Sequence, residues 1–263
     1  MTDLLPIICI PSYQRPDLIT VLTLHYLHMQ NYPSSRIFIF VASEAEGAQY
    51  ALQVPRHLYT QIIVGVLGLK EQRNFISNYF PENQILIHLD DDVRRIKMLD
   101  QQMTFLDLVR QGLAELDAGC GLFGVLPNSD LRRMQNRTTR HLTHILGSFF
   151  MCRNHKALVI NTTEKEDFER SILYFKRYGA VSRFQGAGVD TAYTKNAGGL
   201  QTDPNRRASM MSGISYLMLN YKEFCKTVIK KDNKLDIMLL WRAKTGDPTP
   251  HAELTPLQPS NAC

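Results

Sequence analysis

Three consecutive carboxylates, Asp90, Asp91 and Asp92, directly follow an apolar stretch at 84–89. Adjacent like charges repel one another unless a cation lies among them. Carboxylate oxygens are hard ligands that suit Mg²⁺ or Mn²⁺, and such an ion often carries a diphosphate. We therefore expect Asp90 and Asp92 to hold a divalent metal; the alternative is a solvated acidic turn or a helix cap. His88, within the apolar stretch, is expected to be a core residue.

A second segment, rich in proline, follows the apolar run at 7–10. It contains Pro11, Ser12, Tyr13 and Arg15, of which Tyr13 and Arg15 can reach a base and a diphosphate. The alternative is a rigid turn, because proline fixes φ without implying a ligand.

A third segment places Lys70 and Arg73 three positions apart at the start of an expected helix at 70–79. Residues at this spacing share a helix face, and phosphate binds well at a helix N-terminus. The alternative is a solvated helix face.

Short apolar runs alternate with helix-like segments in the first half of the chain. The expected strands are 7–10, 36–42, 61–66 and 84–89, and the expected helices are 17–31 and 70–79. This alternation predicts an α/β fold with a parallel sheet flanked by helices on both faces. Ligands bind at the carboxyl ends of such strands, where the three segments above lie.

The second half is expected to complete the same domain. Its expected elements are a helix at 104–118, a strand at 122–126, a strand pair at 148–152 and 157–160, a helix at 166–178, a mobile lid or surface loop at 196–207, and a lysine-rich helix or helix-turn at 221–234. We expect one domain over 1–244, with a nucleotide-binding part at 1–100, an acceptor part at 101–244 and a small C-terminal helical extension. A loose, proline-containing tail follows at 245–263.

Composition narrows the class of protein. The chain has 263 residues, of which 44% are hydrophobic and 21% charged, so a disordered protein is excluded. No apolar run reaches the roughly 20 residues of a membrane span, and the N-terminus does not resemble a secretory signal. Five cysteines without a Cys-x-x-Cys pair predict reduced thiols, no zinc site and a cytoplasmic location. The net charge of +5 is compatible with a polyanionic partner.

Taken in order, the motifs Pro11-Ser12-Tyr13-x-Arg15, Gly68-x-Lys70-x-x-Arg73-Asn74 and Asp90-Asp91-Asp92 resemble those of GT-A nucleotide-sugar glycosyltransferases of the family 2 kind. Lys165-Glu166-Asp167 resembles the Glu-Asp element that supplies the catalytic base in inverting members. The resemblance covers about residues 5–190. It implies a GT-A fold, a UDP-sugar as the donor substrate and Mn²⁺ or Mg²⁺ as the cofactor.

The resemblance also implies roles for single residues. Asp167 would take the proton from the acceptor hydroxyl in a single inverting displacement, with Glu166 as the competing base. The alternative for this pair is an acidic helix start, which the macrodipole favours. Glu44 stands where such enzymes usually carry an aspartate that reads the uracil. The implied donor-binding residues are Pro11, Ser12, Tyr13, Arg15, Glu44, Lys70, Arg73, Asn74, Asp90, Asp91, Arg206 and Arg207.

A narrower resemblance extends from Lys165 to Phe184. The stretches at 165–170 and 174–179, followed by Arg183-Phe184, are similar to glycosyltransferases associated with TET/JBP oxygenases, which include phage DNA-hypermodifying enzymes. This implies a phage source and an acceptor that is 5-hydroxymethylcytosine or 5-hydroxymethyluracil in double-stranded DNA. A base inside a duplex must be flipped out to reach such a site.

Two basic clusters bear on the DNA partner. Cationic side chains follow phosphates and aromatic rings stack on bases, whereas the alternative for each cluster is a solvated face. The clusters are Arg132, Arg133, Arg137 and Arg140, and Lys222, Lys226 and Lys230 with Tyr221 and Phe224 interleaved. Alternative functions are a glycosyltransferase with a polysaccharide or protein acceptor, and a nucleotidyltransferase or nucleotide-binding module.

Overall fold

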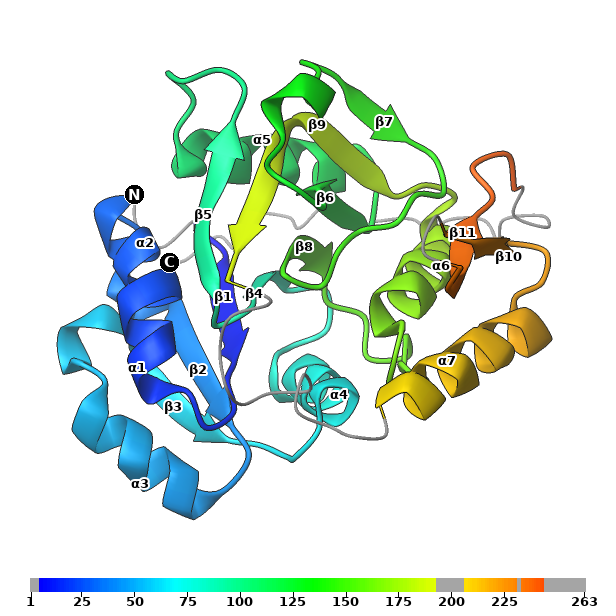
Figure 1. Ribbon diagram of the computed structural model, residues 1–263. Coiled ribbons are helices and arrows are strands. Elements are labelled where there is room, and N and C mark those ends of the chain that lie inside the picture. Colours follow the sequence, from blue (N-terminus) through cyan, green and yellow to red (C-terminus); the bar gives the residue numbers. More distant parts are fainter. Residues whose placement is uncertain (1–4, 193–205, 231–232, 244–263) are drawn as a thin grey trace, which may run out of the picture.

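The fold is built on a mixed sheet, which has nine strands in the computed structural model; the described residues are 5–192, 206–230 and 233–243 (Figure 1). In sheet order the strands are β3 (Gln61–Val64), β2 (Ile37–Val41), β1 (Ile7–Pro11), β4 (Ile85–Leu89), β8 (Phe149–Arg153), β6 (Leu122–Leu126), β9 (Ser182–Thr191) and β5 (Val93–Met98), with β7 (Thr138–Arg140) also paired to β9. A second, two-stranded sheet joins β10 (Cys225–Ile229) and β11 (Leu235–Leu239).

Helices cover the sheet on both faces. They are α1 (Pro16–Ile19), the π-helix η2 (Thr20–Leu24), α2 (His25–Met29), α3 (Glu44–Gln53), α4 (Leu69–Tyr79), α5 (Phe105–Asp117), α6 (Glu166–Tyr178) and α7 (Arg206–Asn220). Short 3₁₀ turns are η3 (Ser34–Arg36), η4 (Arg56–Leu58) and η5 (Leu131–Arg133). In Figure 1, α1, α2 and α3 lie on one side of the first strands, and α4, α6 and α7 lie on the other.

The central strand β1 shows why both faces are covered. Successive side chains of a strand point to opposite faces of the sheet. Ile8 and Ile10 belong to a core that includes the α1–α2 region and α5, whereas Ile7 and Cys9 belong to a second core that includes α4, α6 and α7. An uninterrupted apolar strand is therefore buried on both sides, as expected for a parallel α/β sheet.

The order of the first four strands reverses at β1. Strand β1 pairs in parallel with β2 on one side and with β4 on the other, and β2 pairs in parallel with β3. The chain thus runs outward from β1 to β3 and returns to β4 across β1. In α/β sheets, ligands usually bind at the carboxyl ends of the strands next to such a reversal. The predicted α/β fold is confirmed, and antiparallel pairs such as β4 with β8 complete the sheet.

Two predicted elements are wrong. No strand forms at 157–160, because the backbone N–H and C=O of Ile160 pair with the side-chain amide of Asn74 at 3.0 and 2.8 Å. The stretch at 221–234 is not a helix but contains β10, the first strand of a hairpin with β11. Lysines at 222, 226 and 230 imitate the spacing of a helix face, yet Lys226 and Lys230 lie on or next to a strand.

Other expectations concern residues beyond these elements. The tail at 245–263 and most of the loop at 196–207 lie outside the described residues. Within the part of the chain that the structure describes, no helix combines the length and apolar character needed to cross a bilayer. The cysteines in that part, Cys9, Cys120, Cys152 and Cys225, are buried and free.

Candidate functional site

The acidic turn after β4 is tied to the loop after β1. Ser12 donates a hydrogen bond to Asp91 Oδ2 at 2.7 Å, and Arg15 Nη1 lies 3.3 Å from Asp91 Oδ1. Tyr50 completes this link, because its hydroxyl lies 2.7 Å from Ser12 Oγ and accepts the backbone N–H of Arg15 at 2.9 Å. Burial raises the pKa of Asp91 to about 6, despite the hydrogen bond from Ser12 and the charge of Arg15. Asp91 therefore joins two loops, and its oxygens face the protein.

Asp90 is held by Arg73, a buried residue of α4. Arg73 Nη2 contacts Asp90 Oδ1 at 2.8 Å and the carbonyl of Gly147 at 2.9 Å. Arg73 Nη1 donates to His88 Nδ1 at 3.0 Å. Burial and the nearby Arg73 lower the pKa of His88 well below its usual value, so its imidazole is neutral. The expectation that His88 is a core residue is confirmed, since its ring stacks on Phe150.

Asp92 lacks such a partner. It is buried, and no ion pair joins it to any of the described residues. Burial, together with the charges of Asp90 and Asp91, raises its pKa to about 7. These oxygens fit a divalent cation, whose charge would offset this repulsion. The described residues contain no group of three or more His, Cys, Asp and Glu side chains that could hold a metal by themselves. An ion here would therefore need other oxygens, such as those of a diphosphate and water.

Glu166, at the start of α6, approaches the same place. Its Oε2 accepts a hydrogen bond from Arg170 Nη1 at 2.5 Å, one turn along the helix. A Cβ added to Gly147 would lie 2.9 Å from Glu166 Oε1 and 3.7 Å from Arg73 Nη2, so these two groups line the same space. Burial raises the pKa of Glu166, although Arg170 and Arg73 oppose the shift.

Asp167 points to a different partner. Its Oδ2 lies 2.7 Å from His144 Nε2, and its Oδ1 accepts the backbone N–H of Phe168 at 3.0 Å. The ring of His144 stacks on Phe168 with ring centroids 4.1 Å apart. Burial alone would raise the pKa of Asp167, but the charge and hydrogen bond of His144 lower it to about 2. Asp167 is thus ionised at neutral pH and firmly positioned.

The other residues expected at the site have different surroundings. Tyr13 is half-exposed and Glu44 is exposed in the first turn of α3. Lys70 pairs with Glu71 at 2.9 Å. The amide of Asn74, which binds the backbone of Ile160, is not free for a ligand. Pro11 ends β1, and Arg206 and Arg207 begin α7.

The first basic cluster is partly neutralised, because two carboxylates pair with three of its four arginines. Arg132 and Arg133 both lie near Asp130, at 3.0 and 3.8 Å, and Arg140 binds Glu115 at 2.7 Å. Arg137 donates to the side chain of Gln185 at 3.2 Å.

The second cluster lacks its expected aromatic rings. Lys222, Lys226 and Lys230 are exposed, but Tyr221 and Phe224 are buried. Tyr221 donates its hydroxyl to Glu169 at 3.0 Å. The expectation that these two rings interleave with the lysines on the surface is therefore wrong, because both rings pack in the core.

Sequence reasoning missed Glu46. Its carboxylate accepts the backbone N–H of Ala42 at 2.7 Å and that of Gln14 at 2.5 Å, which ties the loop after β2 to the loop after β1. The signal was present, because Ser43 and Glu46 have the spacing of a capping box. Ser43 caps α3, accepting the backbone N–H of Glu46.

Several solved structures share this architecture at low sequence identity. Mannosyl-3-phosphoglycerate synthase from Rubrobacter xylanophilus matches with a TM-score of 0.52 and 11% identity, over 89% of this chain and 85% of that chain. Glucosyl-3-phosphoglycerate synthase from Mycobacterium tuberculosis matches with a TM-score of 0.50 and 10% identity, over 91% of this chain and 88% of that chain.

A structure of TarS from S. aureus matches with a TM-score of 0.44 and 14% identity, over 69% of this chain. This chain thus spans only 58% of that TarS chain. No protein-family model and no curated protein matches the sequence. The first two likenesses, together with the order of the strands, show an α/β fold of the GT-A kind.

Proposed function

We propose that the protein is a metal-dependent glycosyltransferase that moves a sugar from a nucleoside diphosphate sugar to an acceptor hydroxyl. The observation that carries this proposal is the position of Arg73. It binds Asp90 and the Gly147 carbonyl, and the space beside Gly147 is also lined by Glu166. Arg73 thereby joins the acidic turn after β4 to the start of α6, at the edge of the sheet where ligands bind.

In this proposal the donor lies across the carboxyl ends of β1 and β4. Asp90 and Asp92 would hold a Mg²⁺ or Mn²⁺ ion, whose charge would offset that of the departing nucleoside diphosphate. Arg73 adds positive charge on the side of α4, and the loop with Tyr13 and Arg15 lies where a uridine would bind. In support, a protein of the same fold, glucosyl-3-phosphoglycerate synthase, has a solved complex with Mn²⁺ and UDP-glucose.

The acceptor hydroxyl is deprotonated on the α6 side. Asp167 is ionised and oriented by His144, so it can accept the proton as the hydroxyl attacks the anomeric carbon. Glu166 is the competing base, since burial raises its pKa and so makes it a better proton acceptor than an ordinary glutamate. In either case one displacement inverts the anomeric configuration.

The acceptor itself is the open part of the proposal. The solved structures of similar fold give no support to hydroxymethylated DNA, and the arginines of the first basic cluster already have acidic or amide partners. The proposal therefore does not assume a DNA acceptor, and hydroxymethylated DNA is one of the acceptors that the experiment tests.

The test incubates the protein with Mn²⁺ and a panel of UDP-sugars. One set of reactions contains DNA with hydroxymethylcytosine or hydroxymethyluracil, and another contains sugar and peptide acceptors. Mass spectrometry follows the glycosylated product, and released UDP is measured in parallel. Asp167→Asn and Glu166→Gln identify the base, because the variant that lacks it keeps UDP-sugar binding but loses transfer. Asp117→Asn, a change at an exposed carboxylate, is the matched control.

Each outcome has a clear meaning. Transfer to one acceptor supports the proposal and names the acceptor. Release of UDP without transfer keeps the donor assignment and excludes the acceptors tested. Release of pyrophosphate from nucleoside triphosphates, with no reaction of any UDP-sugar, would favour a nucleotidyltransferase instead.

A further inference from the structure

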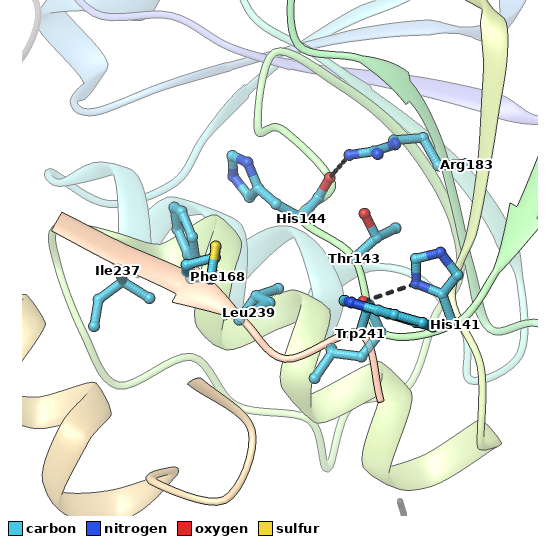
Figure 2. A pocket seen from close by; sticks show the side chains of 10 residues that line it. His141, Thr143, His144, Phe168, Arg183, Ile237, Leu239 and Trp241 are labelled. Atoms are coloured by element: carbon cyan, nitrogen blue, oxygen red, sulfur yellow. Dashed lines mark hydrogen bonds between the residues drawn. The ribbon is translucent and has the colours of Figure 1, made fainter. Parts of the chain in front are cut away.

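A pocket of about 390 Å³ lies beside the Asp167–His144 pair. Its walls come from the loop before β8, the start of α6, strand β9 and the β11 segment, and they include His141, His144, Phe168, Arg183, Leu239 and Trp241 (Figure 2). His144 and Phe168 stand at one end, and His141 and Trp241 stand together at the other. The pocket lining therefore combines apolar side chains such as Leu239, aromatic rings such as Phe168 and Trp241, and the guanidinium of Arg183.

The cation is Arg183, which lines the pocket and has no acidic partner among the described residues. Its Nη1 donates to the backbone carbonyl of His144 at 3.3 Å, and its buried Nε has no hydrogen-bond partner among the described residues. Burial lowers the pKa of Arg183. No carboxylate in the described part of the chain forms an ion pair with it. Arg183 is partly buried, and a partly buried cation without a counter-charge has a cost that a bound anion would offset.

Trp241 supplies a flat surface at the far end. It is 57% exposed, its ring lies 6.1 Å from that of His141, and Arg242 lies over its ring at 4.5 Å. An exposed indole flanked by polar groups is a surface on which a sugar ring or a base can stack.

His144 connects this pocket to the proposed chemistry. Its side chain lines the pocket and holds Asp167 Oδ2 at 2.7 Å, while its carbonyl accepts the hydrogen bond of Arg183. A molecule in the pocket is therefore one side chain away from the carboxylate that is proposed to accept a proton. The donor groups Arg73, Asp90 and Glu166 lie outside the pocket walls.

We infer that this pocket binds the acceptor and selects one that carries a phosphate next to a ring. Arg183 binds the phosphate, Trp241 stacks on the ring, and His144 faces the side where the reacting hydroxyl lies. The assignment of the ligand as the acceptor rests on the proposed function. The binding of a phosphorylated ring compound in the pocket does not depend on that function. A phosphorylated sugar and a nucleotide share this chemistry, and the experiment separates them.

The test uses Trp241 as its own reporter, because it is the only tryptophan in the chain. Tryptophan emission is followed while glucose 6-phosphate or thymidine 5′-monophosphate is added without donor, and affinities are confirmed by calorimetry. Glucose and thymidine are the uncharged counterparts. We expect the phosphorylated probes to change the emission and to bind at least about tenfold more tightly than the uncharged ones, as a charge-assisted pair predicts. The better of the two phosphorylated probes identifies the ring.

Variants then assign the contact. Arg183→Gln should weaken the phosphorylated probe about tenfold, and Arg183→Lys should keep much of its binding. Arg95→Gln removes the same charge at an exposed position of β5, outside the pocket walls, so it should have little effect. Thermal unfolding verifies that the three variants fold, and their binding of UDP with Mn²⁺ should be unchanged.

The inference is overturned if neither phosphorylated probe binds, if the uncharged probes bind equally well, or if Arg183→Gln weakens binding no more than Arg95→Gln does. The proposed function fails separately. In that case the phosphorylated probe still binds at Arg183, but no UDP-sugar binds or reacts.

Discussion

The hydroxyl of Thr23 donates a hydrogen bond to the backbone carbonyl of Asp90 at 2.8 Å and accepts the backbone N–H of Val93 at 3.0 Å. Thr23 is fully buried and lies in the π-helical turn η2. A π-helical turn is rare and shifts the side chains that follow it around the helix axis. Here the π-helical turn directs the Thr23 hydroxyl to the backbone of Asp90 and of Val93. The first helical segment thus fixes the backbone of the acidic turn that carries Asp90 and Asp92.

Replacing Thr23 with valine should loosen that turn. Valine has the same shape but leaves the Asp90 carbonyl and the Val93 N–H without this partner, which costs about 1–3 kcal/mol of unfolding free energy. Denaturant unfolding measures the loss. Thr23→Ser retains the hydroxyl and should lose much less. A larger loss in Thr23→Ser than in Thr23→Val would show that the methyl packing, and not the hydrogen bonds, matters at this position.

Asp92→Asn should raise the stability of the metal-free protein and at the same time weaken its binding of a metal ion. Asp92 is buried next to two other carboxylates, and its raised pKa shows that the ionised form is disfavoured. Removing this charge should therefore stabilise the metal-free protein, by up to about 4 kcal/mol above neutral pH. The same variant should lose most of the stabilisation that Mn²⁺ gives to the natural protein, since binding to the folded state alone raises stability.

Thermal unfolding with Mn²⁺ and with a chelator tests this prediction. Asp117→Asn, at a carboxylate whose side chain is 75% exposed, should show neither effect. If Mn²⁺ stabilised the Asp92→Asn protein as much as the natural one, Asp92 would not be a ligand.

Arg73→Gln should destabilise the protein strongly. Arg73 is almost completely buried and binds Asp90, His88 and the Gly147 carbonyl, so its loss leaves several polar groups unpaired. Removing one partner of a buried ion pair costs about 3–5 kcal/mol, and the lower end applies because Asp90 is 32% exposed. Arg95→Gln is the matched control, since Arg95 is 59% exposed next to Asp190 and should cost less than about 1 kcal/mol. Urea unfolding that ranks the two variants equally would contradict this reasoning.

The sequence was sufficient for those parts of the site that depend on neighbouring residues. The alternation of Ile7 and Ile8 between two cores, and the position of Asp90 at a strand end, follow from local pattern and the rules of parallel sheets. Strand β9 was not predicted, because Gly186 and Gly188 interrupt its pattern, although it pairs with β6, β7 and β5.

Contacts between distant segments could not be predicted. The pairing of His144 with Asp167, 23 residues apart, depends on how the loop before β8 meets α6. The same is true of Arg183, whose carbonyl partner is 39 residues away. Neither spacing corresponds to a helix turn or a hairpin, so only the assembled fold brings these groups together.

The ion pair of Asp167 with His144 should make stability depend on pH in the acid range. In the folded protein the pKa of Asp167 is lowered from 3.8 to about 2, so folding favours the ionised carboxylate. The resulting stabilisation is present above about pH 4 and is lost as the pH falls toward 2, and it amounts to about 2 kcal/mol. Asp167→Asn removes the titrating group, so its unfolding free energy should fall less steeply over that range.

Urea unfolding between pH 2 and pH 5 measures the difference between the two proteins. His144→Gln should flatten the same profile, because without the histidine the pKa of Asp167 loses the charge that lowers it. Asp117→Asn should follow the natural protein throughout. If Asp167→Asn and the natural protein lost stability in parallel, the carboxylate would not be held ionised by His144, and its assignment as a positioned base would lose its physical support.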